Sequence, residues 1–413
     1  MKTRIFSGLK ALINLFTATT TTTTDFYIFI YTFFWFVFLL KGVLHIMKLI
    51  FTKSSLSKAV GIVMKAVPTR TTMSILECIL IDASTNIIKF TANDMELGIE
   101  TIVEGEIIEK GKIAIDAKLF SEIVRKLPDN DITIETDSNY TAYITCEKSK
   151  FNISGKSGDD FSYLPVIIKD KTISLSQFTL KETINQTIFS TALNDNNKMM
   201  TGELFEVQNN SLKVVGLDGH RIAIRNIPLE GTADNVKVVV PGKTLIEISK
   251  ILSNDAEAMV NIYFTSNHIL FEFDDTIVVS RLIEGEYFRI NQMLSSDYET
   301  KIIINKKELL DSIDRANLLI KESEKKPIII NITDGSLEVN VNSSIGSLNE
   351  DIDISKEGKD IMIGFNPKFL IDALRVIDDE EVSIYLVNPK APCFIRDKDE
   401  TYIYLILPVN FSA

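Results

Sequence analysis

Cysteine is scarce in this chain, and the positions of its few cysteines exclude two kinds of scaffold. Three occur in 413 residues, and they lie far apart without a Cys-x-x-Cys pair: Cys78, Cys146 and Cys393. Such a set predicts neither a disulfide framework nor a zinc site, and it is typical of buried thiols in a reducing cytosol. The chain also lacks a glycine-rich phosphate loop of either common type, which argues against catalysis.

Positive charge is in deficit as well. The chain carries 44 lysines and arginines against 56 acidic residues, and its net charge is −12. Proteins that bind nucleic acid usually offer a basic surface, so this balance by itself argues against such a partner. The objection loses force if a few exposed cations are gathered on one surface.

Tryptophan occurs once, and Trp35 lies in a segment unlike the rest of the chain. Residues 26–40 form an aromatic run, and with residues 41–46 the apolar stretch approaches about 20 residues, enough to span a bilayer. One interpretation of residues 1–46 is a membrane anchor through residues 26–46. The other is an upstream extension of a cytoplasmic protein whose translation starts at Met47, and the start of the repeats there favours it. Without this segment's four cations and one anion, the net charge of −12 becomes −15.

The main signal in the chain is a threefold repeat. A strand, an amphipathic helix, a tight turn and a second strand are predicted for three segments: Ile113–Thr136, Val238–Phe264 and Ile361–Leu386. The lysines that open the helices, at positions 118, 243 and 368, are 125 residues apart, and a second cation follows each after seven residues: Lys118/Arg125, Lys243/Lys250 and Lys368/Arg375. A step of seven returns nearly to the same helix face. Each repeat is therefore predicted to present two cations on one exposed face.

The period divides the rest of the chain into three domains, residues 47–170, 171–296 and 297–413. Each is predicted to hold two amphipathic helices and roughly eight short strands. Tight turns between consecutive strands indicate antiparallel sheets, so the predicted fold class is α+β with helices packed on one face. The first helix is expected to be capped by Ser54 or Ser55. The domains could stand as beads, a solenoid or an arc, and an arc closed through a partner chain would be half of a closed ring.

Several motifs of residues 47–413 are similar to those of one known family. They are MKLIF at Met47, PTRTTMSIL at Pro68, VVGLDGHRIAI at Val214, VVVPGKTLIEISKIL at Val238 and the terminal YLILPV at Tyr404. On these residues the chain resembles the bacterial DNA polymerase III beta subunit, the sliding clamp, across all three repeats. The resemblance implies a processivity factor with no catalytic residues, cofactor or metal. It also implies a head-to-tail homodimer that forms a ring of six similar domains around duplex DNA.

The same resemblance implies protein partners and a DNA-facing surface. A clamp loader complex would open the ring, which would tether the DNA polymerase III catalytic subunit, and other replication and repair proteins would dock through linear motifs. A weakly basic lumen fits this role, because cations that face phosphates attract DNA without reading its sequence. The candidate DNA-facing residues are Arg70, Lys118, Arg125, Lys243, Lys250, Lys368 and Arg375. For each of them the alternative is an ordinary solvated charge.

The LDGHR segment at residues 217–221 has two interpretations. His220 with Asp218 could form an acid–base pair of a DNA-processing enzyme, but no convincing nucleophile lies near it, and His45 and His268 stand alone. In the family, the matching segment helps to wall a hydrophobic pocket for short linear peptides.

Carried over by position, the predicted pocket has twelve residues. They are Met200, Leu217, Gly219, His220, Arg221, Ile222, Phe288, Met293, Leu405, Leu407, Pro408 and Val409. Flexible methionines suit a pocket that accepts several partners. For Leu405 and Leu407 the alternative is strand core. Phe288 stands where the family pattern has proline, which leaves the shape of the pocket open.

For the ring interface, the resemblance points to Phe151 and Ile153 of one protomer and to Leu318 and Leu319 of the other. Adjacent helix positions 318 and 319 cannot both face one core, so an exposed apolar pair there predicts association. A DNA sliding clamp is therefore the predicted function. The alternative is a membrane-anchored scaffold that uses a clamp-like body as a peptide-binding module.

Overall fold

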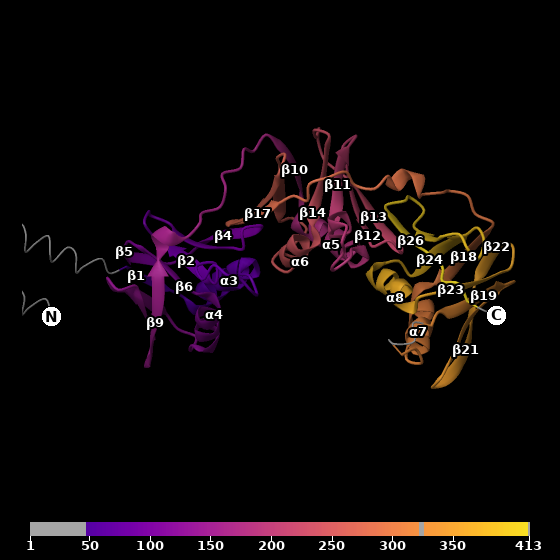
Figure 1. The fold of residues 1–413 in the computed structure, drawn as a ribbon, viewed down its shortest axis with the longest axis horizontal. Helices are drawn as coiled ribbons and strands as arrows, with labels where there is room; N and C mark the ends of the chain where they lie inside the picture. Colours follow the sequence, from indigo (N-terminus) through magenta and orange to yellow (C-terminus); the bar gives the residue numbers. More distant parts are fainter. Residues whose placement is uncertain (1–46, 322–325, 412–413) are drawn as a thin grey trace, which may run out of the picture. The chain divides into compact units, whose positions relative to one another are not determined.

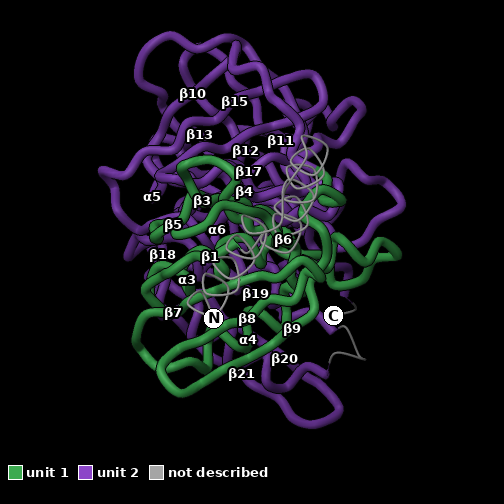
Figure 2. The backbone as a smooth tube through the Cα atoms, turned by 90° about the vertical axis from the view of Figure 1, so that its left-hand side faces the viewer, with its two compact units in different colours: residues 1–91, 102–162 green, residues 92–101, 163–413 purple. Residues whose placement is uncertain are grey.

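The computed structural model describes residues 47–321 and 326–411 in two compact units, which are coloured separately in Figure 2. Of the described residues, the first unit contains 47–91 and 102–162, and the second contains 92–101, 163–321 and 326–411. The membrane-anchor interpretation concerns residues 26–46 and so falls outside the described residues. Within the described part of the chain, no helix is both long and apolar enough to cross a membrane.

The first unit is an antiparallel sheet with two helices (Figure 1). The strand order is β3-β2-β6-β9-β8-β7-β1-β5. The strands are β1 Lys48–Phe51, β2 Cys78–Asp82, β3 Ile88–Asn93, β5 Glu106–Glu109, β6 Lys112–Asp116, β7 Ile132–Thr136, β8 Thr141–Cys146 and β9 Ser149–Ser157, and the helices are α3 Lys53–Val63 and α4 Ala117–Lys126. The last two residues of β3 belong to the second unit.

The caps of these helices explain where they begin. The predicted cap of α3 was wrong: the N-cap is Thr52, two or three residues earlier and directly after β1, and its hydroxyl accepts a hydrogen bond from Ser55 N at 3.2 Å. The residue between the strand and the helix thus satisfies a helix N–H that would otherwise be unpaired. In α4 the Asp116 carboxylate does the same for Leu119 N at 2.8 Å.

The second unit holds the second and third repeats. The second repeat has α5 Gln177–Asn185, α6 Gly242–Ser249, β10 Lys171–Ser176, β11 Gly202–Gln208, β12 Ser211–Leu217, β13 Arg221–Pro228, β14 Val236–Pro241, β15 Met259–Phe264, β16 His268–Phe273 and β17 Thr276–Arg281. The third has α7 Lys306–Asn317, α8 Pro367–Val376, β18 Thr300–Asn305, β19 Ile328–Thr333, β20 Ser336–Ser343, β21 Gly346–Asp353, β22 Ser355–Gly358, β23 Ile361–Phe365, β24 Glu381–Leu386, β25 Cys393–Arg396 and β26 Tyr402–Ile406. Strand β4, Leu97–Val103, adds to the edge of β17. The predicted α+β class with two helices per repeat is confirmed.

One sheet joins the second and third repeats. Its order is β14-β11-β12-β13-β26-β25-β24-β18-β22, so β13 of the second repeat pairs with β26 near the C-terminus. In this register Ile222 lies opposite Leu405, and Arg225 lies opposite Tyr402. The second repeat also has a sheet of order β10-β15-β16-β17-β4, and the third has one of order β21-β20-β19-β23.

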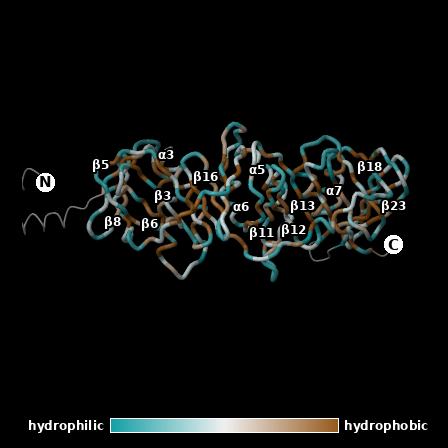
Figure 3. Tube along the Cα trace, turned by 90° about the horizontal axis from the view of Figure 1, so that it is seen from above, coloured by the Kyte–Doolittle hydropathy of each residue, from teal (hydrophilic) through white to brown (hydrophobic). Residues whose placement is uncertain are grey.

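Alternation along β13 and β26 gives this sheet two different faces. Ile222, Ile224, Ile403 and Leu405 belong to one apolar cluster, whereas Ala223, Tyr402, Tyr404 and Ile406 belong to the core that includes residues of α7 and α8. Successive side chains of a strand point to opposite faces, which produces this division. Figure 3 shows that hydrophobic residues are concentrated along the strands and helices, and hydrophilic residues in many of the connecting loops.

Candidate functional site

The LDGHR segment forms the tight turn between β12 and β13. Asp218 N donates to Arg221 O at 3.3 Å, and the Asp218 Oδ1 atom accepts from His220 N at 3.1 Å and Arg221 N at 3.2 Å. Gly219 has φ +83°, a conformation that glycine adopts without strain. A Cβ at this position would lie 3.9 Å from Met200 Cε. The turn and the short helix around Met200, Lys198–Thr201, are therefore neighbours.

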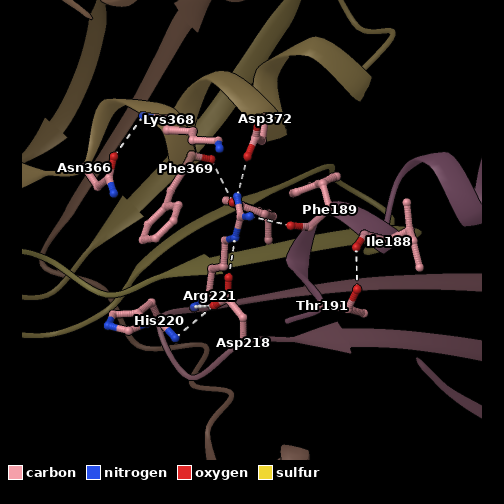
Figure 4. Close-up of polar contacts among 11 residues, drawn as sticks. Ile188, Phe189, Thr191, Asp218, His220, Arg221, Asn366, Lys368, Phe369 and Asp372 are labelled. Carbon is pink, nitrogen blue, oxygen red and sulfur yellow. Dashed lines mark hydrogen bonds and ion pairs between the residues drawn. The ribbon is translucent and has the colours of Figure 1, made fainter. Parts of the chain in front are cut away.

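Arg221 connects this turn to the third repeat (Figure 4). Its Nε donates to Asp218 Oδ2 at 2.9 Å, its Nη1 donates to Asp372 Oδ2 of α8 at 2.6 Å, and its Nη2 donates to Phe189 O. The guanidinium lies over the Phe369 and Phe189 rings, with its central carbon 4.5 Å and 5.4 Å from their centroids. Its side chain is almost fully buried, so this network joins two repeats through one charged group.

The surroundings of Arg221 keep it charged. Burial acts to lower the pKa of Arg221, but nearby Tyr404 and hydrogen bonds to Asp372 and Asp218 outweigh burial and raise it above the ordinary value. A buried cation with two carboxylates and a carbonyl has its donors satisfied by the protein itself. We infer that Arg221 positions the turn and the third repeat, and that its guanidinium lies on the face of the sheet opposite Ile222.

The geometry gives the Asp218–His220 pair a structural role. The Asp218 carboxylate accepts from backbone N–H groups with one oxygen and from Arg221 with the other. Its contact with His220 is to the backbone nitrogen, whereas an orienting partner for a general base would bind the imidazole ring. The His220 ring lies beside Phe369 of α8, with centroids 6.0 Å apart.

An apolar cluster lies next to the turn and contains five of the predicted pocket residues. Leu217, Ile222 and Leu405 are buried in it, and Met200 and Phe288 pack against it half-buried. Phe288 also makes an edge-to-face contact with Tyr287, with ring centroids 5.5 Å apart, and lines a cavity of about 280 Å³ together with Leu204, Val215 and Ile290. Leu405 is buried on β26 within this cluster, and its assignment to a pocket or to the strand core stays a prediction.

The C-terminal tail runs along the edge of this cluster. Leu407 N donates to His220 O at 2.8 Å, which places the tail directly beside the turn, and the Leu407 side chain is 39% exposed. Val409 N donates to Gly364 O of β23 at 2.8 Å, so Pro408 and Val409 lead away from the cluster to the third repeat. Met293 is exposed at the end of the turn Ile290–Gln292. Among the predicted apolar pocket residues, a ligand could reach the partly buried Met200 and Phe288 and the exposed Met293 and Leu407.

Three residues of this site were not predicted. Met199 and Tyr287 are buried in the cluster, and the Tyr287 hydroxyl donates to Val215 O at 3.1 Å. Asp372 holds Arg221 from a helix of the next repeat. The sequence did contain a signal for Met199. Two adjacent methionines in an otherwise polar loop are expected to pack against an apolar surface.

All seven predicted DNA-facing cations are exposed, but several of them have acidic neighbours. Ion pairs join Arg125 to Glu122, Lys243 to Asp94, Lys250 to Glu247 and Arg375 to Asp314. Within the described residues, neither Lys118 nor Lys368 lies within ion-pair distance of a carboxylate. The six helix cations therefore differ in the charge that they can offer to a phosphate. Each helix begins one residue before its lysine, at Ala117, Gly242 or Pro367.

The predicted ring-interface residues are exposed to different degrees. Leu318 follows α7 and is 77% exposed, whereas Leu319 is partly buried against the core of the third repeat. On β9, Phe151 is 38% exposed, and Ile153 is buried. Both leucines lie after the end of α7, and because Leu319 is not exposed, the expected exposed apolar pair is reduced to Leu318; the interface itself stays a prediction. The three cysteines are buried and unpaired, as expected.

Comparisons with known proteins agree across the described chain. The family models of the DNA polymerase III beta subunit match residues 47–165 (N-terminal domain), 174–288 (central domain) and 291–410 (C-terminal domain). The beta sliding clamp of Bacillus subtilis is 36% identical over 377 residues, which are 88% of this chain and 100% of that protein. The beta sliding clamp of Staphylococcus aureus strain Mu50 is 36% identical over 358 residues, 84% of this chain and 95% of that protein.

Solved structures show the same relationship. A crystal structure described as a DNA polymerase III beta subunit of Eubacterium rectale is 70% identical, with a TM-score of 0.86, and covers 89% of this chain and 100% of its own. The DNA polymerase sliding clamp of Bacillus subtilis is 34% identical, with a TM-score of 0.85 and the same coverage. None of these relatives supports the membrane-anchored scaffold. The chain belongs to the DNA polymerase III beta subunit family, the beta sliding clamps, which are processivity factors and not enzymes.

Proposed function

We propose that this sliding clamp docks its protein partners on the apolar cluster beside the LDGHR turn. The observation that carries the proposal is a buried apolar cluster at the turn, with Met200 and Phe288 packed half-buried against it and the exposed Leu407 beside the turn, where its backbone nitrogen binds His220 O. Exposed apolar groups above a preformed core suit an extended peptide with apolar anchors. The DNA polymerase III catalytic subunit, the clamp loader complex and repair proteins with linear clamp-binding motifs are the proposed ligands.

Replacing Leu407 and Met200 together with alanine is expected to weaken the binding of a polymerase-derived peptide by about 30- to 900-fold, because each of the two anchor contacts contributes on the order of 1–2 kcal/mol. Fluorescence anisotropy with a labelled peptide from the polymerase measures the affinity. Sedimentation of the same variant should show an unchanged dimer.

The matched control removes a leucine and a methionine from exposed positions elsewhere. Leu119→Ala with Met259→Ala should leave the peptide affinity at the wild-type value, because both side chains lie outside the apolar cluster. Unchanged affinity of the Leu407/Met200 variant would rule out this pocket assignment.

The DNA-facing role is proposed for the exposed cations of α4 and α8, for Lys243 of α6 and Lys250 directly after it, and for Arg70. It is supported by their recurrence at one spacing on equivalent helices and by the exposure of every member. The acidic neighbours of four of them reduce the attraction for phosphate, and a weakly attractive lumen suits a ring that must slide on DNA. Lys118 and Lys368, which lack such neighbours among the described residues, should contribute most.

Replacing Lys118 and Lys368 with alanine is therefore expected to weaken duplex binding more than replacing Lys243 and Lys250. The two variants lose the same charge, but Lys243 and Lys250 already have carboxylates at 2.5 Å and 2.7 Å. A salt titration with a labelled duplex measures both effects, and the slope of log K against log salt should fall by about 0.9 for each phosphate that the variant no longer neutralises. Equal weakening in the two variants would contradict the proposed ranking.

We also propose that the ring is a head-to-tail homodimer in the cytoplasm. Leu318, as a highly exposed apolar side chain, supports an interface there, with Phe151 as its proposed counterpart on the partner protomer. Loader-dependent stimulation of polymerase processivity by residues 47–413 tests the whole assignment. The N-terminal peptide and intact mass of the native protein, taken from soluble and membrane fractions, test the location.

A further inference from the structure

The tail that follows β26 is attached to both the second and the third repeat. Leu407 N donates to His220 O of the turn at 2.8 Å, and Val409 N donates to Gly364 O of β23 at 2.8 Å. The proline between these two residues has a fixed φ, which makes the link between the two attachments stiff. The position of Leu407 therefore depends on how the tail is held on the third repeat as well as on its own hydrogen bond.

Gly364 lies within β23, which is the edge strand of the sheet of order β21-β20-β19-β23. Its neighbours Ile363 and Phe365 are buried in the core of the third repeat, so position 364 faces the other side of the sheet. The φ angle of Gly364 is not in the left-handed region, so the backbone conformation does not require glycine. A glycine inside a strand often marks a place where another segment approaches closely.

The segment that approaches Gly364 is the tail itself. A Cβ on Gly364 would lie 2.7 Å from Phe411 Cδ1 and 2.8 Å from Val409 O, and both distances are shorter than non-bonded atoms allow. The half-buried Phe411 ring thus packs directly on the backbone of β23. The missing side chain at position 364 provides the space for this contact.

The Leu407 side chain has little packing of its own to fix it, because it is 39% exposed. Its place beside the turn is set by the backbone of the tail. A group that is already held in its binding position loses less conformational freedom when a ligand binds, and the affinity is higher for that reason. Without the Phe411 contact, the tail would have to be ordered each time a peptide binds.

We propose that Phe411, packed on Gly364, is a positioning residue that holds Leu407 ready for the docking peptide. This inference rests on the proposed docking of peptides at the apolar cluster beside the turn. Phe411 acts through the tail and does not need to touch the peptide. The affinity of the peptide site then depends on a contact with the edge strand of the third repeat.

The test measures the affinity of the full-length protein for the labelled polymerase-derived peptide by fluorescence anisotropy. Phe411→Ala and Gly364→Ala, which break the contact from opposite sides, should each weaken binding by about 5- to 10-fold. The double variant should bind no more weakly than the weaker single variant, because both changes remove one shared contact. Phe411→Tyr keeps the ring and should restore the wild-type affinity.

A second measurement follows the tail directly. Hydrogen exchange at the Leu407 and Val409 amides should be faster in Phe411→Ala and Gly364→Ala than in the wild type, because both amides are hydrogen-bonded only while the tail is held. Circular dichroism should show both variants folded as the wild type. The matched controls are Phe178→Ala, at an exposed phenylalanine of α5, and Gly61→Ala, where a Cβ would meet nothing within 4 Å. Both controls should keep the wild-type affinity and tail exchange.

The outcomes separate this inference from the peptide site on which it rests. If Leu407→Ala with Met200→Ala weakens peptide binding but Phe411→Ala does not, the site stands and the positioning role is overturned. Tail exchange that is unchanged in Phe411→Ala would overturn it as well, since the contact would then hold nothing. Unchanged affinity of the Leu407/Met200 variant would remove the site and the positioning role together.

Discussion

Replacing Arg221 with methionine is expected to lower the free energy of unfolding of the second unit by about 3–5 kcal/mol. The substitution keeps the approximate length of the side chain but removes all of its hydrogen-bond donors. The Asp218 and Asp372 carboxylates and the Phe189 carbonyl then lose their shared partner. Urea unfolding followed by circular dichroism measures the change.

Two further variants show whether the loss comes from the buried network. Arg315→Met removes an arginine whose ion pair with Glu350 is solvent-exposed, and it should cost about 1 kcal/mol or less. Adding Asp372→Asn to Arg221→Met should recover part of the stability, because it removes an unpaired buried charge. If Arg221→Met costs no more than Arg315→Met, the buried network does not stabilise the junction.

Replacing Glu203 with glutamine is expected to stabilise the protein increasingly as the pH rises from about 4.5 to about 8. Glu203 lies on β11, is fully buried, and has no hydrogen-bond partner on either carboxylate oxygen. Burial raises the pKa of Glu203 to about 8. The folded protein therefore keeps this group protonated under conditions where the unfolded chain ionises it.

The direction of the effect follows from proton linkage. The pKa of Glu203 is higher in the folded state, so the wild type is most stable below the unfolded value of 4.5 and loses stability as the pH rises towards 8. The loss is at most about 1.4 kcal/mol per pH unit, or roughly 5 kcal/mol over the whole window. Glutamine cannot ionise, so the difference in unfolding free energy between Glu203→Gln and the wild type should increase over this range and level off above it.

Urea unfolding of both proteins at several pH values from about 4 to about 9 measures this difference in unfolding free energy. This range covers the interval between the unfolded and folded pKa values of Glu203. Glu206→Gln, on the same strand, is the matched control for the chemical change, because Glu206 is only half-buried and pairs with Lys237 at 3.3 Å. A stability difference for Glu203→Gln that does not change with pH would refute the buried-carboxyl interpretation.

Local periodicity was enough to predict the helices and their cations. Lys118, Lys243 and Lys368, which are 125 residues apart, lie within one residue of the helix starts. The helices could be predicted because the spacing of apolar residues that indicates a helix involves only residues close together in the sequence. The acidic partners of the cations were not predictable in the same way. Asp94 reaches Lys243 from 149 positions away, and Asp314 reaches Arg375 from 61, and such distances are set by tertiary packing.

The pairing of β13 with β26 and the role of Arg221 were missed for a similar reason. Alternation predicts that a segment is a strand and which residues share a face, but it does not identify the neighbouring strand. The fold brings Asp372 to Arg221 across 151 positions of sequence. The burial of Glu203 was not predicted, because an acidic residue in a strand is normally expected to face solvent. Both faces of β11 are buried at this position, so its residues do not alternate between buried and exposed there.

The late position of β26 has a consequence for biosynthesis. β13 has β12 on one side, but its other neighbour is the last strand of the described chain. At about 5–20 residues per second, the chain between Pro228 and Tyr402 takes roughly 10–35 s to synthesise. During that time β13 presents an open edge with unpaired backbone groups, which is the kind of surface that promotes aggregation and engages chaperones. Pairing with β26, which becomes possible only after that strand has been made, closes this edge and joins the second and third repeats.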